Sequence, residues 1–573
     1  MREAGPRGAD PVDTETRSME GNPPLKTVLS PERLRWSVAA GASALIALMC
    51  AAPAAPAAST EVIVRFAAPT NIDQGSAVVE AAGGRITRRL SIIDGVGAVL
   101  DGSELGALRS DSRVLSITPN ANVSTSATRR VATVTGAPAV PAPPAADPYA
   151  FLHSAYNQSI HATNAWLSKP GFVTGAGVGV AVVDTGIAGS LPDFNVSPVD
   201  PHSRVIASAV INPDATTATD TWGHGTHVAG LIAGNGINRH PTSFLKDGAF
   251  MGVAPQANLI SVKVSDDNGG ASLIDVIDGI QFAVDHKADF NIRVINLSLN
   301  SETAESYKTD PLDAAVEEAW FKGIVVVAAA GNAGGADDAV SYAPANDPFV
   351  ITVGAVDDQG TQDTSDDLLA DWSSHGRTQD DLVKPEILAP GAHMPATLAP
   401  GAAYASMCPD CVVESNYLRI GGTSMSAGVV SGAAALLIGQ HPDWTPDQVK
   451  GALLNTARNV PGVGVEPQLD AALALRSGDT RVAFDAGAAL NTLLDPTTKV
   501  LDTTKAGMYR ATWAPANGNR IAPWAAQTSF TCSNCAPPSN NGGNVDPSAS
   551  WRASWRASWR ASWRASWRTS FTK

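Results

Sequence analysis

Three long apolar runs constrain the fold of this chain more than any other feature. They cover residues 177–184, 294–299 and 324–330, and each ends in a turn or a polar residue. Continuous apolar runs without alternation are typical of strands that are buried on both faces of a parallel sheet. Residues 275–286 and 311–321 can supply helices that cross between such strands. The sequence therefore predicts an α/β domain with a doubly wound, mostly parallel sheet.

Composition and charge narrow the class of protein. The chain has 573 residues, of which 44% are hydrophobic, so it can bury a core and is not wholly disordered. Its net charge of −15 argues against a dedicated nucleic-acid binder, which would carry a basic face. The charge is uneven, however, because the last 24 residues hold five Arg, one Lys and no acid, together with five of the 13 Trp. An acidic body therefore carries a basic, Trp-rich tail.

The N-terminal region has the pattern of an export signal. Arg33 and Arg35 precede an uncharged run over residues 36–49, and an Ala/Pro-rich stretch follows over residues 50–58. A basic flank, a short apolar run and small residues are typical of a secretory signal. We therefore expect a secreted, extracellular protein.

The five cysteines agree with export. Cys50 would leave with the signal, and the other four form two C-x-x-C pairs at 408/411 and 532/535. A zinc ribbon needs such pairs closer together, and a redox motif needs a thioredoxin-like context. Structural disulfides in an oxidising compartment are favoured, although their connectivity stays open.

A small domain precedes the apolar runs. The expected strands and helices alternate as strand 61–66, helix 73–82, strands 85–93 and 96–100, helix 103–110 and strand 114–117. This β-α-β-β-α-β order predicts a ferredoxin-like fold. The region after it, up to residue 147, is rich in Ala, Pro, Thr and Val, which is the composition of a linker.

The first chemical motif is the Asp-Thr-Gly of residues 184–186, which ends the first apolar run. The carboxyl ends of strands in open α/β sheets are where sites collect. Asp184 could also be half of an aspartic-protease dyad, but that mechanism needs two carboxylates, and no second Asp-Thr-Gly or Asp-Ser-Gly occurs.

The second motif is Gly-His-Gly-Thr-His-Val-Ala-Gly at residues 223–230. His224 and His227 could ligate a metal, but the Glu of an H-E-x-x-H site is missing. The following small, apolar residues predict a buried helix, with His224 near its start and His227 inside its first turn. We interpret His224 as functional and His227 as structural.

Two further motifs supply polar groups at turns. Asn332 ends the third apolar run after a Gly, where its amide could face a cleft. Ser424 lies in Gly-Thr-Ser-Met-Ser-Ala at residues 422–427, at the expected start of a buried helix. The N-terminus of a helix offers unpaired N–H groups and a positive dipole end to a developing oxyanion. Ser424 is not in Gly-x-Ser-x-Gly, which disfavours an α/β-hydrolase nucleophile elbow.

Together these four motifs resemble those of the subtilisin-like serine proteases. The chain order Asp184, His224, Ser424 is that of this family. The resemblance covers about residues 148–478, and residues 59–120 are similar to the family's inhibitory propeptide. It implies a catalytic triad of these three residues, an oxyanion hole containing Asn332, and a substrate-binding set that comprises Ser298, Leu299, Asn300, Ala330 and Gly331.

Some positions depart from the family pattern. Asn300 stands where a Gly is usual, so we expect a narrowed cleft, and Gly428 replaces the usual Pro after Ser424. The resemblance implies chemistry that requires no cofactor. Structural Ca²⁺ stays open but cannot be assigned, because the family's calcium loops cannot be matched, and Asp193 is a candidate ligand.

The sequence therefore predicts a secreted serine endopeptidase made as a zymogen. The alternative is a catalytically idle secreted binding protein that uses the cleft and the Trp/Arg tail. Expected partners are polypeptide substrates and the chain's own propeptide as inhibitor, without nucleic acid, and the protein is expected to be a monomer.

The C-terminal tail repeats Trp-Arg-Ala-Ser. Two interpretations of the tail stay open: it adheres to an anionic cell-surface polymer through Arg and Trp, or it is a disordered, repeat-expanded segment. The expected segments are a signal region at 1–58, a propeptide at 59–120, an Ala/Pro-rich linker at 121–147, a subtilisin-like catalytic domain at 148–478, a C-terminal extension at 479–549 and the repeat tail at 550–573.

Overall fold

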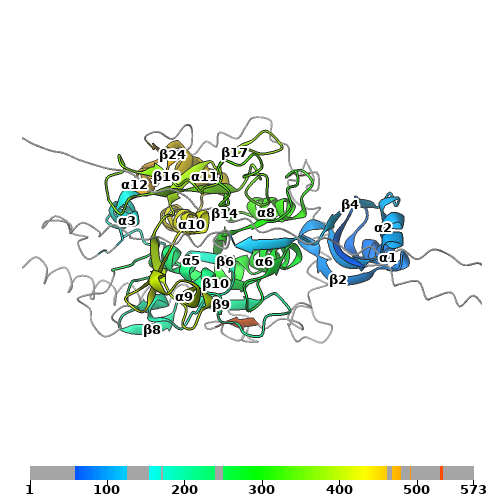
Figure 1. Ribbon diagram of the computed structural model, residues 1–573, viewed down its shortest axis with the longest axis horizontal. Coiled ribbons are helices and arrows are strands. Elements are labelled where there is room, and N and C mark those ends of the chain that lie inside the picture. The colour runs from blue at the N-terminus through cyan, green and yellow to red at the C-terminus, as the bar shows by residue number, and fades with distance from the viewer. Residues whose placement is uncertain are drawn as a thin grey trace, which may run out of the picture. The chain divides into compact units, whose positions relative to one another are not determined.

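The computed structural model describes most of two domains (Figure 1). The described residues are 59–125, 152, 154–168, 172–238, 249–460, 467–478 and 491, together with the backbone of 530–532. The expected signal region, most of the expected linker, the side chains of Cys532 and Cys535, and the repeat tail lie outside these described residues.

The N-terminal domain is a four-stranded antiparallel sheet with two helices. Its elements are β1 (Thr60–Phe66), α1 (Ile72–Ala81), β2 (Arg85–Leu90), β3 (Gly95–Leu100), α2 (Gly102–Arg109) and β4 (Val114–Pro119). The strand order is β2-β3-β1-β4, which confirms the ferredoxin-like prediction. Both helices begin with a capping box, at Asn71 and at Asp101, which satisfies two of the backbone N–H groups at each N-terminus.

One predicted boundary in this domain is wrong. The strand expected over residues 85–93 ends at Leu90, and Ser91–Ile93 form a 3₁₀ turn. The chain leaves the strand because Ile92 and Ile93 are buried in the core of the larger domain instead of in their own.

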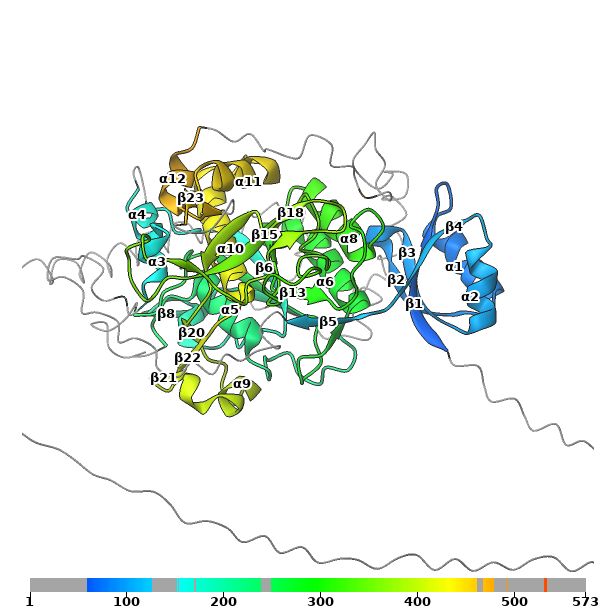
Figure 2. The ribbon, with the colours of Figure 1, turned by 45° about the horizontal axis from the view of Figure 1, so that its top comes forward.

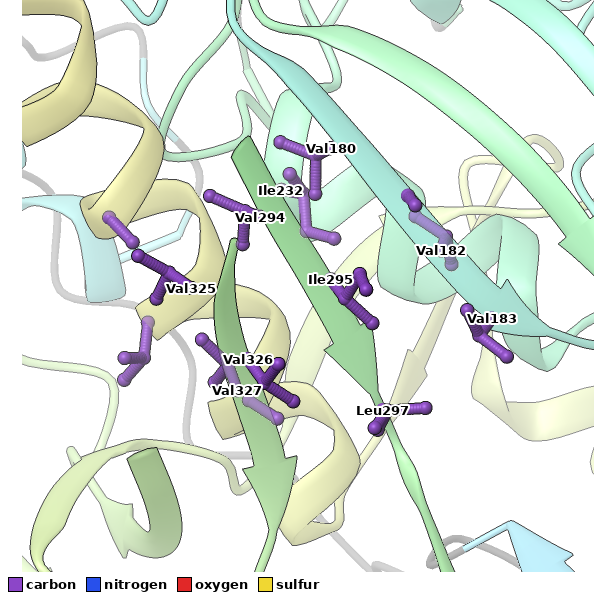
Figure 3. Packing of buried hydrophobic residues seen from close by; sticks show 14 of the residues in the cluster. Val180, Val182, Val183, Ile232, Val294, Ile295, Leu297, Val325, Val326 and Val327 are labelled. Carbon is purple, nitrogen blue, oxygen red and sulfur yellow. The ribbon is translucent and has the colours of Figure 1, made fainter. Parts of the chain in front are cut away.

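The larger domain contains the predicted parallel sheet. From one edge to the other, its parallel strands are β9 (Val205–Val210), β10 (Asn258–Lys263), β6 (Gly179–Asp184), β12 (Ile292–Leu297), β14 (Val325–Ala329), β15 (Ile351–Asp357), β19 (Ile387–Pro390) and β24 (Pro467–Gln468). Antiparallel strands flank it at both edges, with β25 (Phe530–Cys532) on β9 and β23 (Arg458–Asn459) on β24. The Val and Ile side chains of β6, β12 and β14 interdigitate in the core (Figure 3).

Two pairs of helices cover the sheet. Helix α5 (His224–Ala233) packs on α10 (Thr423–Gln440), and α6 (Leu273–Asp285) packs on α8 (Pro311–Phe321). Figure 1 shows β6 and β14 between the two pairs, which is the doubly wound arrangement. By length and composition alone, helix α10 could cross a membrane. However, 89% of it is buried inside the fold, as is usual for a core helix. The predicted capping box at Thr445 is present at the start of α11 (Pro446–Asn455).

A short strand joins the two domains. β5 (Asn122–Thr125) follows the N-terminal domain and reaches β13 (Leu299–Ser301) of the larger domain (Figure 2). It lies antiparallel between β13 and β11 (Ala271–Ser272). These four residues fall at the start of the expected linker. The strands that pair with β5 come from distant parts of the chain, so the sequence around β5 gives no signal of this pairing.

Candidate active site

Asp184 and His224 meet at the carboxyl end of the sheet. Asp184 is the last residue of β6, and His224 is the first residue of α5. His224 Nδ1 lies 2.7 Å from Asp184 Oδ1, and both side chains are fully buried. A Cβ on Gly225 would collide with the carbonyl oxygen of Gly186 and lie 3.1 Å from Asp184 Oδ1. Only glycine therefore allows the first turn of α5 to approach the aspartate this closely.

A buried network braces this pair. Asp220 Oδ1 accepts hydrogen bonds from the Thr185 hydroxyl at 2.9 Å and the Gly223 N–H at 2.7 Å, while Oδ2 accepts from the Thr226 N–H at 2.8 Å. The Thr185 hydroxyl oxygen in turn accepts from the Gly225 N–H at 2.9 Å. Burial raises the pKa of Asp220. Asp220 and Thr185 thus fix α5 to the end of β6. Neither residue was assigned a role from the sequence, although Thr185 lies in the Asp-Thr-Gly motif and Asp220 lies three residues before Gly223.

Ser424 lies one residue inside the N-terminus of α10. Its hydroxyl donates to the Ser298 carbonyl oxygen at 3.1 Å, and the Ser298 hydroxyl donates to the Ser424 carbonyl oxygen at 2.9 Å. Ser424 is fully buried, as is His224. Within the described part of the chain, His224 Nε2 has no hydrogen-bond partner. Hydrogen bonds between a nucleophile and its base are often formed only in the substrate complex.

Asn332 is oriented by the residue before Ser424. Its Oδ1 accepts from the Thr423 N–H at 3.0 Å and from the Thr423 hydroxyl at 3.1 Å. Two donors on the amide oxygen fix which end of the amide is which, and they leave the NH₂ group available as a donor. The side chain therefore offers a preorganised N–H next to the start of α10.

Replacement of Asn332 tests whether that N–H acts on the transition state. We expect Asn332→Ala to lower kcat by about 10²–10³, with a much smaller change in KM, because an oxyanion donor stabilises charge that is absent in the ground state. Steady-state kinetics on a peptide substrate measure both values. A rise in KM at unchanged kcat would instead make Asn332 a ground-state binding group.

His227 has structural contacts, in agreement with its interpretation from the sequence. Its Nε2 lies 3.0 Å from the Met394 carbonyl oxygen and 2.9 Å from that of Leu418. These residues belong to β20 (Met394–Thr397) and β22 (Tyr417–Ile420). Burial lowers the pKa of His227 to about 4, so the ring is neutral near pH 7 and ties α5 to the two strands.

The segment of residues 396–418 packs against His224. Tyr404, on α9 (Ala403–Met407), lies edge-on to His224 with ring centroids 6.2 Å apart and packs on Trp222 at 5.5 Å. The Cys408–Cys411 disulfide follows this helix, as the sequence predicted for a structural cystine. Burial raises the pKa of the Tyr404 hydroxyl, which lies against the side chains of Thr125 and Trp222. Tyr404 carries no motif, so sequence reasoning missed it.

The substrate-binding residues predicted from the resemblance lie on two segments, β13 with the residue before it and the residues after β14, which are the two walls of the expected cleft. Leu299 and Asn300 lie on β13, where they pair with Thr125 and Ser124 of β5. Ala330 and Gly331 follow β14, and the Gly331 N–H donates to the Thr423 hydroxyl at 3.0 Å. Both walls lead to the residues around Ser424, and β5 lies along the first of them.

The candidate calcium ligand does not fit a metal. Asp193 is fully buried, and its carboxylate accepts from the hydroxyls of Thr397 and Tyr417 and from the backbone N–H groups of Gly236 and Asn238. Ca²⁺ binds oxygen acceptors, whereas these partners are donors. Among the described residues, no group of three or more His, Cys, Asp or Glu side chains is arranged to hold a metal.

Comparison with known proteins gives the family. The model of the subtilase family matches residues 175–486, more than half of the chain. Serine protease AprX from Bacillus subtilis is 39% identical over 288 residues, which cover 49% of this chain and 62% of AprX. Subtilisin from Bacillus pumilus is 36% identical over 288 residues, which cover 50% of this chain and 85% of that protein.

A solved structure agrees on the fold. Fervidolysin from Fervidobacterium pennivorans, described as a keratinolytic enzyme related to subtilisin, matches with a TM-score of 0.56 at 24% identity, over 74% of this chain and 61% of that one. The matched segment spans about three-fifths of AprX and of fervidolysin. The parallel sheet, the order of the motifs and these matches agree, and the chain belongs to the subtilase family.

Proposed function

We propose that this protein is a secreted serine endopeptidase made as a zymogen. The observation that carries the proposal is the strand β5, which lies along β13 and ends beside the segment that holds Ser424. An extended peptide substrate binds a protease by pairing with a strand in this way. Here the chain's own N-terminal part occupies that place.

The chemistry follows from the polar groups around Ser424. Its Oγ attacks the scissile carbonyl carbon as His224 Nε2 takes the hydroxyl proton, and Asp184 stabilises the imidazolium through Nδ1. The oxyanion accepts hydrogen bonds from the Asn332 amide and the Ser424 N–H. The C–N bond then breaks, and Nε2 returns the proton to the leaving amine. Water hydrolyses the resulting acyl-enzyme by the same steps in reverse.

The register of β5 points to the bond that is cleaved during maturation. Thr125 pairs with Leu299 and Ser124 with Asn300. The described strand ends at Thr125, and the carbonyl oxygen of Ser298, one residue before Leu299, accepts from the Ser424 hydroxyl. We therefore place self-cleavage between Ser126 and Ala127.

The N-terminal domain has the contacts of an inhibitor. Arg88 on β2 forms an ion pair with Asp278 on α6 at 2.5 Å and lies 3.7 Å from Asp275, and these side chains are at most 10% exposed. The buried guanidinium of Arg65 donates to the Thr309 carbonyl oxygen at 3.1 Å. With Ile92 in the core of the larger domain, these contacts explain how the cleaved propeptide stays bound and blocks the cleft.

Removal of Arg88 is expected to speed activation. Breaking a buried ion pair on one side leaves an uncompensated charge at a cost of about 3–5 kcal/mol, so Arg88→Ala weakens propeptide binding by at least about 100-fold. We expect a shorter lag between self-cleavage and full casein hydrolysis, measured at pH 8, because burial raises the pKa of Asp278 only to about 6.

A neighbouring pair provides the matched control. Arg89 pairs with Asp73 on the surface, with side chains 38% and 52% exposed, so Arg89→Ala is expected to leave the lag nearly unchanged. If Arg88→Ala and Arg89→Ala activate at the same rate as the wild type, the buried pair does not hold the propeptide.

Covalent labelling tests the proposed activity. A fluorophosphonate that phosphonylates activated serines should label the matured protein once per chain, on the peptide that contains Ser424, and should stop casein hydrolysis in proportion. His224→Ala should abolish the labelling, because the base is gone. Labelling at another serine, or casein hydrolysis that survives complete labelling of Ser424, would refute the proposal.

A further inference from the structure

One side chain crosses between the two walls of the cleft. Asn300 lies on β13, and its Nδ2 donates to the carbonyl oxygen of Ala329, the last residue of β14, at 2.9 Å. A Cβ on Gly331 would lie 3.5 Å from Asn300 Oδ1, so the amide also reaches the segment that leads to Asn332. Asn300 therefore joins the wall that pairs with β5 to the opposite wall.

The bridge lies where a substrate side chain has to enter. Asn300 pairs with Ser124 of β5, and the carbonyl oxygen of Ser298, two positions before Asn300, accepts from the Ser424 hydroxyl. A substrate strand in this register has the residue before the cleaved bond two positions after the residue opposite Asn300, and side chains two positions apart lie on the same face. We therefore expect that side chain on the face from which Asn300 reaches across the gap between β13 and the end of β14. The amide of Asn300 fills part of this gap, and its hydrogen bond holds the two walls at a fixed separation.

We propose that Asn300 is a specificity-determining residue that restricts the position before the cleaved bond to small side chains such as Gly, Ala and Ser. This inference rests on the proposed protease function and names its class of substrate. A large substrate side chain has to displace the Asn300 amide and break its hydrogen bond to Ala329. The amide and the Ala329 carbonyl oxygen then lose their partners where the bound substrate excludes water. Small side chains fit beneath the bridge without that loss. The proposed self-cleavage follows a serine, in agreement with this preference.

The test expresses the full-length chain, lets it activate itself and assays the mature protein. The four substrates are chromogenic peptide anilides that differ only in the residue before the anilide, namely Ala, Ser, Leu and Phe. For the wild type we expect kcat/KM for Ala and Ser to exceed that for Phe by at least about tenfold, within the range by which a pocket discriminates by size. Asn300→Gly should raise kcat/KM for Phe by about tenfold or more, while the value for Ala changes by less than about threefold. Asn300→Ala should give an intermediate ratio, because it removes the bridge but keeps a Cβ.

A second Asn→Gly replacement controls for backbone effects. Asn291 has a positive φ of 48° and donates to the Gly177 carbonyl oxygen before β12, a conformation that glycine tolerates. Asn291→Gly should keep the wild-type preference.

The outcomes separate this inference from the protease proposal. If the wild type cleaves Phe as readily as Ala, or if both Asn300 variants retain the wild-type Phe/Ala ratio, Asn300 does not set specificity, and the protease function stands. If the wild type cleaves none of the four anilides and no casein, the proposed function itself fails.

Discussion

Replacement of Ser424 by alanine is expected to lower kcat on the order of a million-fold, the loss found for triad hydrolases of this family when the nucleophile is removed. The change deletes only the hydroxyl that forms the acyl-enzyme. The first turn of α10 and the Asn332–Thr423 contacts need no Ser424 side chain, so the fold and the oxyanion donors remain. A small residual rate above that of the uncatalysed reaction should therefore survive.

Because Ser424→Ala cannot release its own propeptide, trypsin first removes it from both proteins at Arg129–Arg130, just beyond β5. Progress curves with a peptide anilide, at enzyme concentrations high enough to detect a million-fold loss, then measure this effect. Ser426→Ala is the matched control, because this neighbouring hydroxyl donates to the Ala389 carbonyl oxygen away from His224. Ser426→Ala should lower the free energy of unfolding but leave kcat nearly unchanged. A Ser424→Ala protein within about tenfold of wild type would rule out Ser424 as the nucleophile.

The second large effect is expected at Asp184. Asp184→Asn is nearly isosteric but removes the negative charge 2.7 Å from His224 Nδ1. In a fully buried site that charge holds the imidazole tautomer and stabilises the imidazolium, and its loss costs about 10⁴ in kcat. KM should change little, because the imidazolium forms only during the reaction.

Asp220 provides a matched carboxylate for comparison. It is also buried near the end of β6, but it accepts from Thr185, Gly223 and Thr226 and not from His224. In Asp220→Asn the new NH₂ group faces groups that are themselves hydrogen-bond donors. We therefore expect the free energy of unfolding to fall by about 1–3 kcal/mol. Its kcat should fall far less than that of Asp184→Asn. Equal losses of kcat in the two variants would mean that the charge at Asp184 has no special part in the reaction.

The sequence was most informative where chemistry depends on neighbours in the chain. Asp184 follows an apolar strand, and His224 and Ser424 begin buried helices, and all three local patterns appear in the structure. The parallel sheet was predictable for the same reason, because strands buried on both faces have an unbroken apolar pattern.

The remaining features depend on contacts between distant segments. The strand β5 has the composition of a linker, and only its partners β11 and β13 make it a strand. Tyr404 contacts His224 from a segment that carries no motif. The departure from glycine at Asn300 was visible in the sequence, but its acceptor, the Ala329 carbonyl oxygen, was not. Such contacts have no local signal, because the chain brings them together only after it has folded.

The central claim is that Ser424 cleaves the chain's own substrate-like strand just beyond β5. The most direct measurement is a mass-spectrometric time course of the purified wild type and Ser424→Ala proteins under identical conditions. We predict wild-type fragments that end at Ser126 and begin at Ala127, and a Ser424→Ala chain that stays uncut at this bond. Cleavage at the same bond and rate in both proteins, or a wild-type chain that is never cut there, would contradict it.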